Sequence, residues 1–250
     1  MLKIKTSVFL TVIQTVLLLV ITSASLVSLY DQRKRISEKL VSYLNEGEGD
    51  VYWANEILKG GYVLHFRHAE RDKWIDVQMY DSLESDVHSN GPDNSRFAEN
   101  DYFSNAVCLN NRGKIQARAM GEHLKKIGLP ISKVITSVSC RARQTADIAF
   151  GGYDSMNRLL IHEGPYAEVN RIQKLKDFYA AIELSDGKNV VVSAHNSVIK
   201  KEMFDNANGI GGNLYLEEGG FYVISKKEGK LVLEHEFNNF AYFVKVFYPR

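Results

Sequence analysis

A strand-like run that leads directly into an arginine and a histidine is the feature that most constrains this chain. Residues 61–66 read Gly-Tyr-Val-Leu-His-Phe, and Arg67-His68-Ala69-Glu70 follows at once. In open α/β sheets, ligands bind beyond the carboxyl ends of the strands. A guanidinium offers a rigid fork to phosphate oxygens, and a neutral imidazole can act as a nucleophile. The run therefore favours chemistry on a phosphoryl group, although for these four residues alone a surface Arg-His pair is an equally good interpretation.

Two further strand-like runs end in the same kinds of side chain. Residues 133–135 lead into the segment 136–146, where Arg141 and Arg143 stand in the first turn of a helix predicted from residue 141 to about residue 150. The free N–H groups and the dipole of a helix N-terminus attract anions. Residues 190–192 are three valines, as in a strand buried on both faces, and His195 follows closely. Taken together, three such strand ends favour a binding site over three unrelated structural residues.

These motifs, in this order, resemble those of the histidine phosphatase superfamily, also called the phosphoglycerate mutase-like family. That family carries Arg-His-Gly, then Leu-Thr-x-x-Gly-x-x-Gln-Ala, then Ser-x-x-x-Arg-Ala-x-Gln-Thr-Ala, and finally Gly-His-Gly or Gly-His-Asn. The corresponding segments of this chain are residues 67–69, 109–117, 137–146 and 194–196. The resemblance covers about residues 61–225, and Ala69 and Ala194 replace the usual glycines.

The resemblance implies a phosphomonoester phosphatase that uses His68 as its nucleophile. His68 would attack phosphorus and become a phosphohistidine, which water would then hydrolyse. Arg67, Arg141 and His195 would bind the equatorial oxygens, whose charge must be stabilised during transfer, and Asn196 is a further candidate for binding the substrate. The resemblance implies neither a metal ion nor a cofactor.

The mechanism also needs a general acid for the leaving oxygen. Glu163, which follows a strand-like run at 158–161, is the first candidate, and Glu168 is the alternative, unless it is only an acid at the start of a helix. Arg143 lies two residues beyond Arg141, on another side of the helix, so we expect it at the surface or at the substrate rim. We expect the remaining histidines to be structural or surface residues: His65, His88, His123, His162 and His235.

The order of predicted elements indicates an α/β fold with a mostly parallel sheet and helices on both faces. Strand-like and helix-like segments alternate at 61–66, 112–127, 133–136, 141–150, 158–161, 168–184, 189–193 and 197–204. Three β-type runs, at 220–225, 230–237 and 240–247, could form an antiparallel edge. Residues 61–250 would make one catalytic domain, and its polar insertion at 75–106 is either a cover over the pocket or a surface loop.

The N-terminal region is predicted to be separate from this domain. Residues 7–30 contain no charged side chain and are long enough to span a bilayer as a helix, after a basic segment at 1–6. The length of the segment favours a single-pass signal anchor, and the alternative is a cleaved signal peptide with a site at Thr22-Ser23-Ala24. Lysines before it favour a catalytic domain outside the cytoplasm, in the periplasm of a bacterium, joined through a connecting segment at 31–60.

Charge and cysteine content narrow the choice of partners. The whole chain has a formal net charge of +1, but residues 36–250 hold 26 basic and 29 acidic side chains, which argues against nucleic acid as a partner. Cys108 and Cys140 are each simply buried thiols, or they form a bridge outside the cytoplasm, and their spacing does not decide between the two.

The substrate is predicted only as a class. Residues 66–71 behind an apolar N-terminal segment resemble bacterial envelope phosphatases, which implies a phosphorylated small molecule or an envelope glycan phosphate as the substrate. A phosphoprotein (phosphohistidine) phosphatase is the alternative within the enzymes. A catalytically inactive family member that binds phosphorylated ligands or a partner protein is the alternative from a different class.

Overall fold

The computed structural model describes residues 30, 32–33, 49–72, 107–162, 170–206 and 214–248. The chain divides into two units, Met1–Gly49 and Asp50–Arg250. Nearly all of the predicted membrane span, the insertion at 75–106, and both general-acid candidates, Glu163 and Glu168, lie outside the described residues. No helix within the described ranges is both long enough and apolar enough to cross a membrane.

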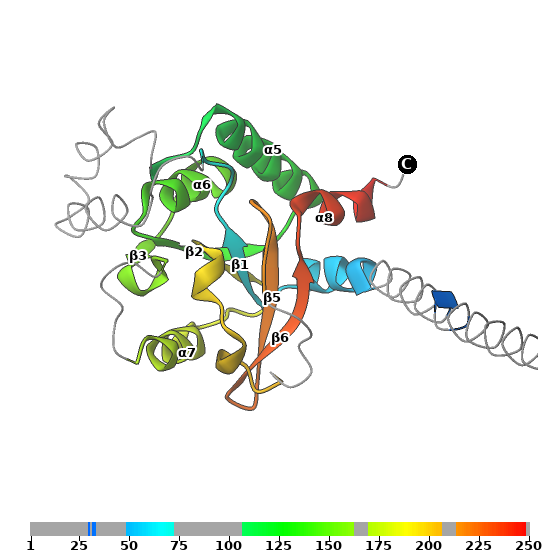
Figure 1. The fold of residues 1–250 in the computed structure, drawn as a ribbon, viewed down its shortest axis with the longest axis vertical. Helices are drawn as coiled ribbons and strands as arrows, with labels where there is room; N and C mark the ends of the chain where they lie inside the picture. Colours follow the sequence, from blue (N-terminus) through cyan, green and yellow to red (C-terminus); the bar gives the residue numbers. More distant parts are fainter. Residues whose placement is uncertain are drawn as a thin grey trace, which may run out of the picture. The chain divides into compact units, whose positions relative to one another are not determined.

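The second unit is a mixed α/β domain built on one six-stranded sheet (Figure 1). The sheet order is β3-β2-β4-β1-β5-β6. The strands β3, β2, β4 and β1 run parallel, whereas β5 is antiparallel to β1 and β6 is antiparallel to β5. A mostly parallel sheet with an antiparallel edge is confirmed, although the edge contains two of the three predicted runs, 220–225 and 230–237. The strand bounds are β1 (Val63–Arg67), β2 (Ile131–Ser137), β3 (Ser155–Asn157), β4 (Asn189–Ala194), β5 (Phe221–Lys227) and β6 (Lys230–Phe237).

Helices cover both faces of this sheet, as predicted. Inward-facing side chains of the strands alternate between two hydrophobic cores: Leu64 and Phe66 belong to one, and Val63 belongs to the other. The first core also contains residues of α5 (Asn111–Ile127), α6 (Cys140–Phe150), α8 (Phe240–Phe247) and the helical residues 50–59. The second contains residues of α7 (Arg171–Ala181) and of the short 3₁₀ turns η2 (Arg158–Leu160), η3 (Asn196–Val198) and η4 (Lys201–Met203).

Three predicted elements differ from the structure. The predicted strand at 240–247 is helix α8, because Asn239 caps it by accepting from Ala241 N at 2.8 Å and because Phe240 and Phe243, three residues apart, both enter the core. The predicted strand at 158–161 is the turn η2, because the Asn157 side chain accepts from Leu159 N at 2.9 Å. The predicted helix at 197–204 is two 3₁₀ turns, separated by extended backbone at Lys200.

The loop after β1 packs directly on the first turn of α5. The Asn110 side chain caps the helix by accepting from Gly113 N at 2.7 Å, and Asn110 N donates to Glu70 O at 3.3 Å. A Cβ atom on Gly113 would lie 1.9 Å from Glu70 O. The glycine is therefore required for this close approach, which fixes the loop that carries His68.

Gly113→Ala should lower the free energy of unfolding by about 2 kcal/mol or more, because the loop after β1 must move away from the new methyl group. Helix propensity alone predicts the opposite, a gain of about 1 kcal/mol. The control is Arg118→Ala, at an exposed position of the same helix, which should change stability by less than about 0.5 kcal/mol. Chemical denaturation measures both variants, and a Gly113→Ala protein as stable as wild type would contradict the close approach.

Candidate active site

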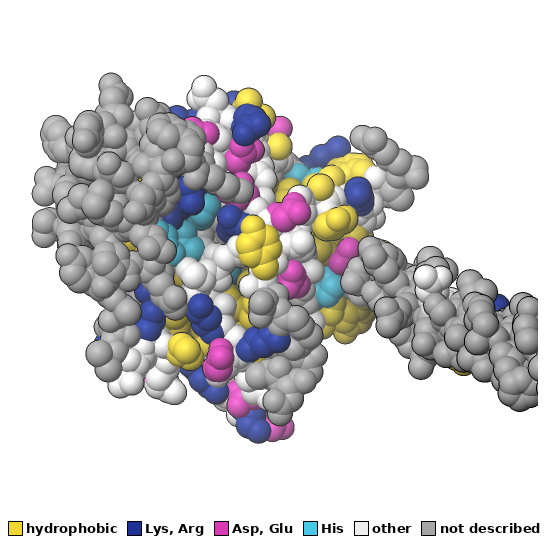
Figure 2. Space-filling model, viewed as in Figure 1, with side chains coloured by type: hydrophobic (Ala, Val, Ile, Leu, Met, Phe, Trp, Pro, Cys, Tyr) yellow, Lys and Arg dark blue, Asp and Glu magenta, His cyan; other side chains and the backbone are white. Residues whose placement is uncertain are grey.

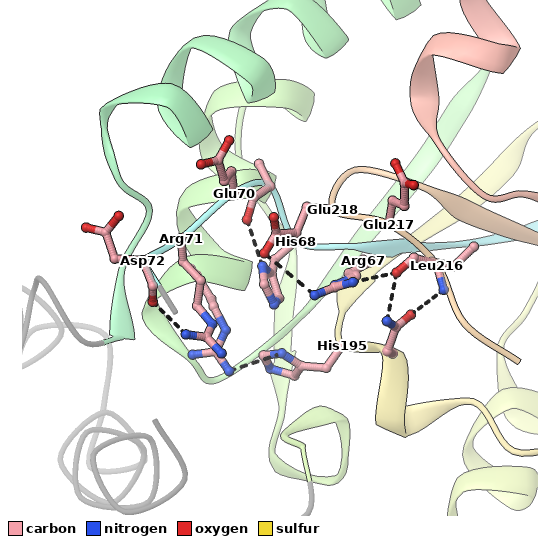
Figure 3. Close-up of polar contacts among 12 residues, drawn as sticks. Arg67, His68, Glu70, Arg71, Asp72, His195, Leu216, Glu217 and Glu218 are labelled. Carbon is pink, nitrogen blue, oxygen red and sulfur yellow. Dashed lines mark hydrogen bonds and ion pairs between the residues drawn. The ribbon is translucent and has the colours of Figure 1, made fainter. Parts of the chain in front are cut away.

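Side chains that follow three neighbouring strands meet at one edge of the sheet. His68 follows β1, Arg141 lies in the first turn of α6 after β2, and His195 follows β4. Strand β4 lies between the other two, and its parallel pairing sets Arg67 beside Ala194. Figure 3 shows the side chains of His68, Arg67 and His195 converging at this edge. The sequence predicted that these residues lie close together, and the parallel order β2-β4-β1 places them so.

His68 is held as a neutral imidazole with one defined unprotonated nitrogen. Its side chain is buried, and burial together with the charges of Arg141 and Arg67 lowers its pKa well below the ordinary value of 6.5. Its Nδ1 lies 2.7 Å from the carbonyl oxygen of Ala69, which can only accept a hydrogen bond, so Nδ1 carries the proton. The lone pair is therefore on Nε2, as a nucleophile requires.

The backbone around His68 is anchored by three successive N–H groups. His68 N donates to Ala194 O at 3.0 Å, Ala69 N donates to Thr145 Oγ1 at 2.9 Å, and Glu70 N donates to Gln116 Oε1 at 2.9 Å. These acceptors belong to β4, α6 and α5, respectively. The loop is thus fixed to three elements, which limits the positions open to the imidazole.

His195 is a second buried, neutral imidazole beside the first. Burial and the charge of Arg141 lower its pKa well below its ordinary value. Its Nδ1 accepts from Arg141 Nη2 at 3.3 Å, so its Nε2 carries the proton and donates to Ser137 Oγ at 3.3 Å. The ring centroids of His195 and His68 are 5.1 Å apart. An oxyanion bound at His68 would therefore lie near an N–H donor.

His65 supports His195 from behind the site. Its Nε2 donates to the carbonyl oxygen of His195 at 3.2 Å, and its Nδ1 accepts from the Tyr179 hydroxyl at 2.6 Å. Burial lowers the pKa of His65 to about 4, so this ring too is neutral near pH 7. The expectation that His65 is structural agrees with these contacts.

Arg141 is almost completely buried, with 1% of its surface exposed. Its Nη1 donates to Val107 O at 3.3 Å, and its Nη2 donates to His195. The preceding residue, Cys140, forms a disulfide with Cys108, which decides the alternative that spacing left open. A guanidinium carries five N–H donors in a planar fork whose geometry matches phosphoryl oxygens.

Arg143 does not lie at the surface, so that part of the expectation is wrong, while a place at the substrate rim stays a prediction. Only 3% of its surface is exposed, and its Nε donates to the carbonyl oxygen of Val138 at 3.1 Å. Its charge also acts on half-buried Asp147, whose pKa is raised by burial and lowered in part by the guanidinium. The side chain turns back to the loop between β2 and α6, where it satisfies a buried carbonyl.

Arg67 is held by the segment 214–218. Its Nη1 donates to Leu216 O, and its Nη2 lies 3.6 Å from Glu218 Oε1 (Figure 3). Its Nη1 also donates to the Tyr215 hydroxyl at 3.2 Å. Its guanidinium carbon also lies 5.4 Å from the centroid of the Tyr215 ring. Asn196 clamps the same segment, since its amide donates to Leu216 O at 2.7 Å and accepts from Leu216 N at 2.8 Å. Contact of Asn196 with substrate stays a prediction.

Two residues of the site were not predicted. The ring centroid of His162 lies 5.3 Å from that of His195, and His162 contributes to the low pKa of His195. His162 directly follows the strand-like run 158–161, so its position after a predicted strand could have indicated a site residue. The charge of Arg71 contributes to the low pKa of His68, and its Nη1 donates to Asp72 O at 2.6 Å (Figure 3). Arg71 stands three residues after His68, but the superfamily motif ends before it.

The electrostatic character of this site is positive. On the face shown in Figure 2, histidine side chains lie beside Lys and Arg side chains. The histidines are neutral near pH 7, so an arriving anion meets guanidinium charge and N–H donors rather than imidazolium groups. No cluster of three or more His, Cys, Asp or Glu side chains suited to a metal ion occurs in the described part of the chain.

Comparison with known families agrees with this geometry. Residues 103–164 match the histidine phosphatase superfamily (branch 1). The resemblance to the histidine phosphatase superfamily is confirmed. The matched segment includes α5, β2 and Arg141 but neither His68 nor His195, which the fold brings to Arg141. The comparison with curated proteins returned no match.

Several solved structures are similar to this chain. The protein histidine phosphatase SixA complexed with tungstate is 15% identical, with 70% of this chain and 96% of that chain covered and a TM-score of 0.44. Mycobacterial hydrolase 1 is 15% identical, with 72% and 99% covered and a TM-score of 0.49. Mycobacterial glucosyl-3-phosphoglycerate phosphatase is 15% identical, with 72% and 99% covered and a TM-score of 0.47.

The buried neutral histidines make stability depend on pH. The folded-state pKa values of His65, His68 and His195 lie below 6.5, so below that pH the unfolded chain binds more protons than the folded one. The free energy of unfolding should therefore fall as the pH drops from about 7.5 to about 5, with each histidine contributing about 1.4 kcal/mol per pH unit once its unfolded form is protonated.

Chemical denaturation at several pH values measures this slope. His68→Gln, which removes one titrating ring, should make the dependence shallower by about one histidine's share. Equal stability of the wild type at about pH 7.5 and about pH 5 would contradict the neutral state of these rings.

Proposed function

We propose that this protein is a phosphomonoester phosphatase that works through a phosphohistidine on His68. One observation carries the proposal: a neutral imidazole with its lone pair on Nε2 is fixed by a backbone carbonyl among the guanidinium groups of Arg67, Arg71 and Arg141. The match of residues 103–164 to the histidine phosphatase superfamily supports the same chemistry. Purely structural histidines would not need several arginines close by.

The chemistry follows from the placement of donors. Nε2 of His68 would form a bond to phosphorus while the bond from phosphorus to the leaving oxygen breaks, and that oxygen would take a proton from the general acid, for which Glu163 is the first candidate. Arg67 and Arg141 would bind the non-bridging oxygens, and His195 would donate its Nε2–H, which Ser137 accepts in the free protein. The Nδ1–H of His68 would keep its bond to Ala69 O, which stabilises the positive charge of the phosphorylated ring. Water would then attack phosphorus while the bond from Nε2 to phosphorus breaks, and its proton would pass to the carboxylate left by the first step. This releases phosphate and regenerates both His68 and the acid.

The full chain should hydrolyse p-nitrophenyl phosphate in the presence of EDTA, and His68→Ala should abolish this activity. His235→Ala is the matched control, because His235 lies on β6 and pairs with Asp50 at 2.7 Å, so its removal should leave turnover unchanged. A rapid quench with labelled substrate should trap a protein adduct that is labile in acid and stable in base, as a phosphoramidate is.

Each other outcome of that experiment has a definite meaning. Turnover that survives in His68→Ala would refute the nucleophile assignment. A wild-type protein that does not turn over, but whose melting temperature rises with added phosphate, would favour the inactive phosphate-binding alternative.

We further infer a substrate of the cell envelope and a catalytic domain outside the cytoplasm, tethered by a single membrane span. The uncharged run 7–30 behind Lys3 and Lys5 supports the tether. The Cys108–Cys140 disulfide supports the compartment, because disulfides persist in oxidising environments. An envelope glycan phosphate suits such a location better than a soluble cytoplasmic metabolite does. A phosphohistidine on a protein remains the alternative substrate, and comparison of both compounds under the same conditions discriminates them.

Glu163→Gln should slow the hydrolysis of alkyl phosphates far more than that of p-nitrophenyl phosphate. A general acid contributes on the order of 10²–10⁴-fold when the leaving oxygen needs its proton, and nitrophenolate leaves almost without one. Glu168→Gln is the matched control, with little effect on either substrate. Steady-state kinetics on both substrates measure the ratio. Equal slowing of the two by Glu163→Gln, or the selective loss appearing in Glu168→Gln instead, would refute Glu163 as the acid.

A further inference from the structure

We propose that the Cys108–Cys140 disulfide positions Arg141 for oxyanion binding, so that the protein binds phosphate tightly only when this bond is oxidised. The inference rests on the proposed function, because it concerns the same pocket. It adds two positioning residues, Cys108 and Cys140, to a site whose other members act through charge and hydrogen bonds.

The contacts of residues 107–109 motivate this proposal. Val107 O accepts from Arg141 Nη1 at 3.3 Å, and Leu109 N donates to Gln144 Oε1 at 2.9 Å. Between them, Cys108 is bonded to Cys140, with 4.8 Å between the two Cα atoms. Three consecutive residues are therefore attached to the first turns of α6. Cys140 directly precedes Arg141, and Cys108 directly follows Val107. The disulfide therefore links Arg141 to the residue whose carbonyl accepts its hydrogen bond.

The disulfide is the strongest of these three attachments. Residues 107–109 belong to no strand of the sheet, so ladder hydrogen bonds do not hold the Val107 carbonyl in place. Cys108 and Cys140 are 32 residues apart in sequence, so chain connectivity does not hold them together closely either. A single hydrogen bond is weak enough to exchange with water once the segment moves. The disulfide keeps the acceptor within reach of the guanidinium.

Orientation of Arg141 matters because this side chain acts on both histidines. It donates to His195 Nδ1 at 3.3 Å, and its charge lowers the pKa values of His195 and His68. A long side chain with several rotatable bonds loses conformational entropy when it binds an anion. The Val107 carbonyl restricts the Arg141 guanidinium before the anion arrives, so less entropy is lost on binding. Without that acceptor, we expect weaker binding of a phosphoryl group.

Reduction of the Cys108–Cys140 disulfide would convert the tightly binding form into the weakly binding one. A dithiol reductant transfers two electrons and two protons, the S–S bond breaks, Cys108 and Cys140 become thiols, and the reductant becomes a disulfide. The Val107 carbonyl is then free to leave Arg141. The active form would be the oxidised one, which agrees with the compartment proposed above and would keep the enzyme inactive before export.

A double-mutant cycle tests the proposal on the full chain. The four proteins are wild type, Cys108→Ser/Cys140→Ser, Arg141→Ala, and the combination of all three substitutions. Calorimetric titration with inorganic phosphate gives Kd, and kinetics with p-nitrophenyl phosphate give kcat and KM separately. Loss of the disulfide should raise Kd about tenfold in the wild-type background and less than about twofold in the Arg141→Ala background. Equal effects in both backgrounds would overturn the proposal.

Loss of stability must be separated from loss of positioning. Leu231→Ala is the matched control, because Leu231 is a buried residue near the opposite end of the sheet, where it pairs with Lys226 at the β5–β6 turn. It should lower the melting temperature and leave Kd for phosphate unchanged when binding is measured well below that temperature. A Kd that rises in proportion to lost stability in both proteins would refute a specific role of the disulfide.

Dithiothreitol gives an independent readout on the same proteins. It should reproduce the tenfold rise in Kd in the wild type and have no effect on Cys108→Ser/Cys140→Ser. A wild type that binds phosphate equally well with and without the reductant, although its thiols titrate as free, would overturn this inference alone. A wild type that neither binds nor hydrolyses phosphate compounds in either state would overturn the proposed function as well.

Discussion

Parallel pairing of β1 and β2 with the central β4 is the constraint on which the site depends. It sets Arg67 beside Ala194 and Thr136 beside Ser193, so the three strands end at the same level. The residues that follow each strand must then share one small volume. The close approach of the two imidazoles and the buried guanidinium of Arg141 follows from this shared edge.

The second determinant is the balance of charge within that volume. Two imidazoles lie close to arginines, and burial and like charge both oppose their protonation, so they remain neutral near pH 7. The guanidinium groups are in turn satisfied by backbone carbonyls, by His195 and by Glu218. Glu218 supplies negative charge beside Arg67, and a bound phosphoryl dianion would add more. Under the proposed function, we expect a bound anion to stabilise the folded protein.

Much of this arrangement could be predicted from the sequence, because the ends of the strands can be recognised there. Parallel strands end at the same edge of a sheet, so the residues that follow them are expected to meet. Arg67, His68, Arg141 and His195 were found in that way. Arg143 was misplaced because position along a helix does not show that its side chain turns back to the Val138 carbonyl.

Other parts depend on tertiary contacts that no local pattern contains. The aromatic-rich sequence of α8 is typical of a strand, but its aromatic side chains pack into the core as a helix. The ring of Phe243 packs edge-on to that of Phe237, with 5.2 Å between the ring centroids. The contact of His162 with His195 and the pairing of Cys108 with Cys140 join residues 33 and 32 positions apart, respectively. The contacts of Asn196 with Leu216 could not be predicted from the sequence either. They hold the segment whose Leu216 carbonyl accepts from Arg67.

A crystal structure of the protein with vanadate tests the central claim most directly. Vanadate adopts the geometry of phosphorus during transfer, so the account predicts a vanadium atom bonded to Nε2 of His68. Its equatorial oxygens should accept hydrogen bonds from Arg67, Arg141 and His195, while Nδ1 of His68 still donates to Ala69 O. Vanadate bound elsewhere, or bound in this pocket with His68 turned away from it, would contradict the account.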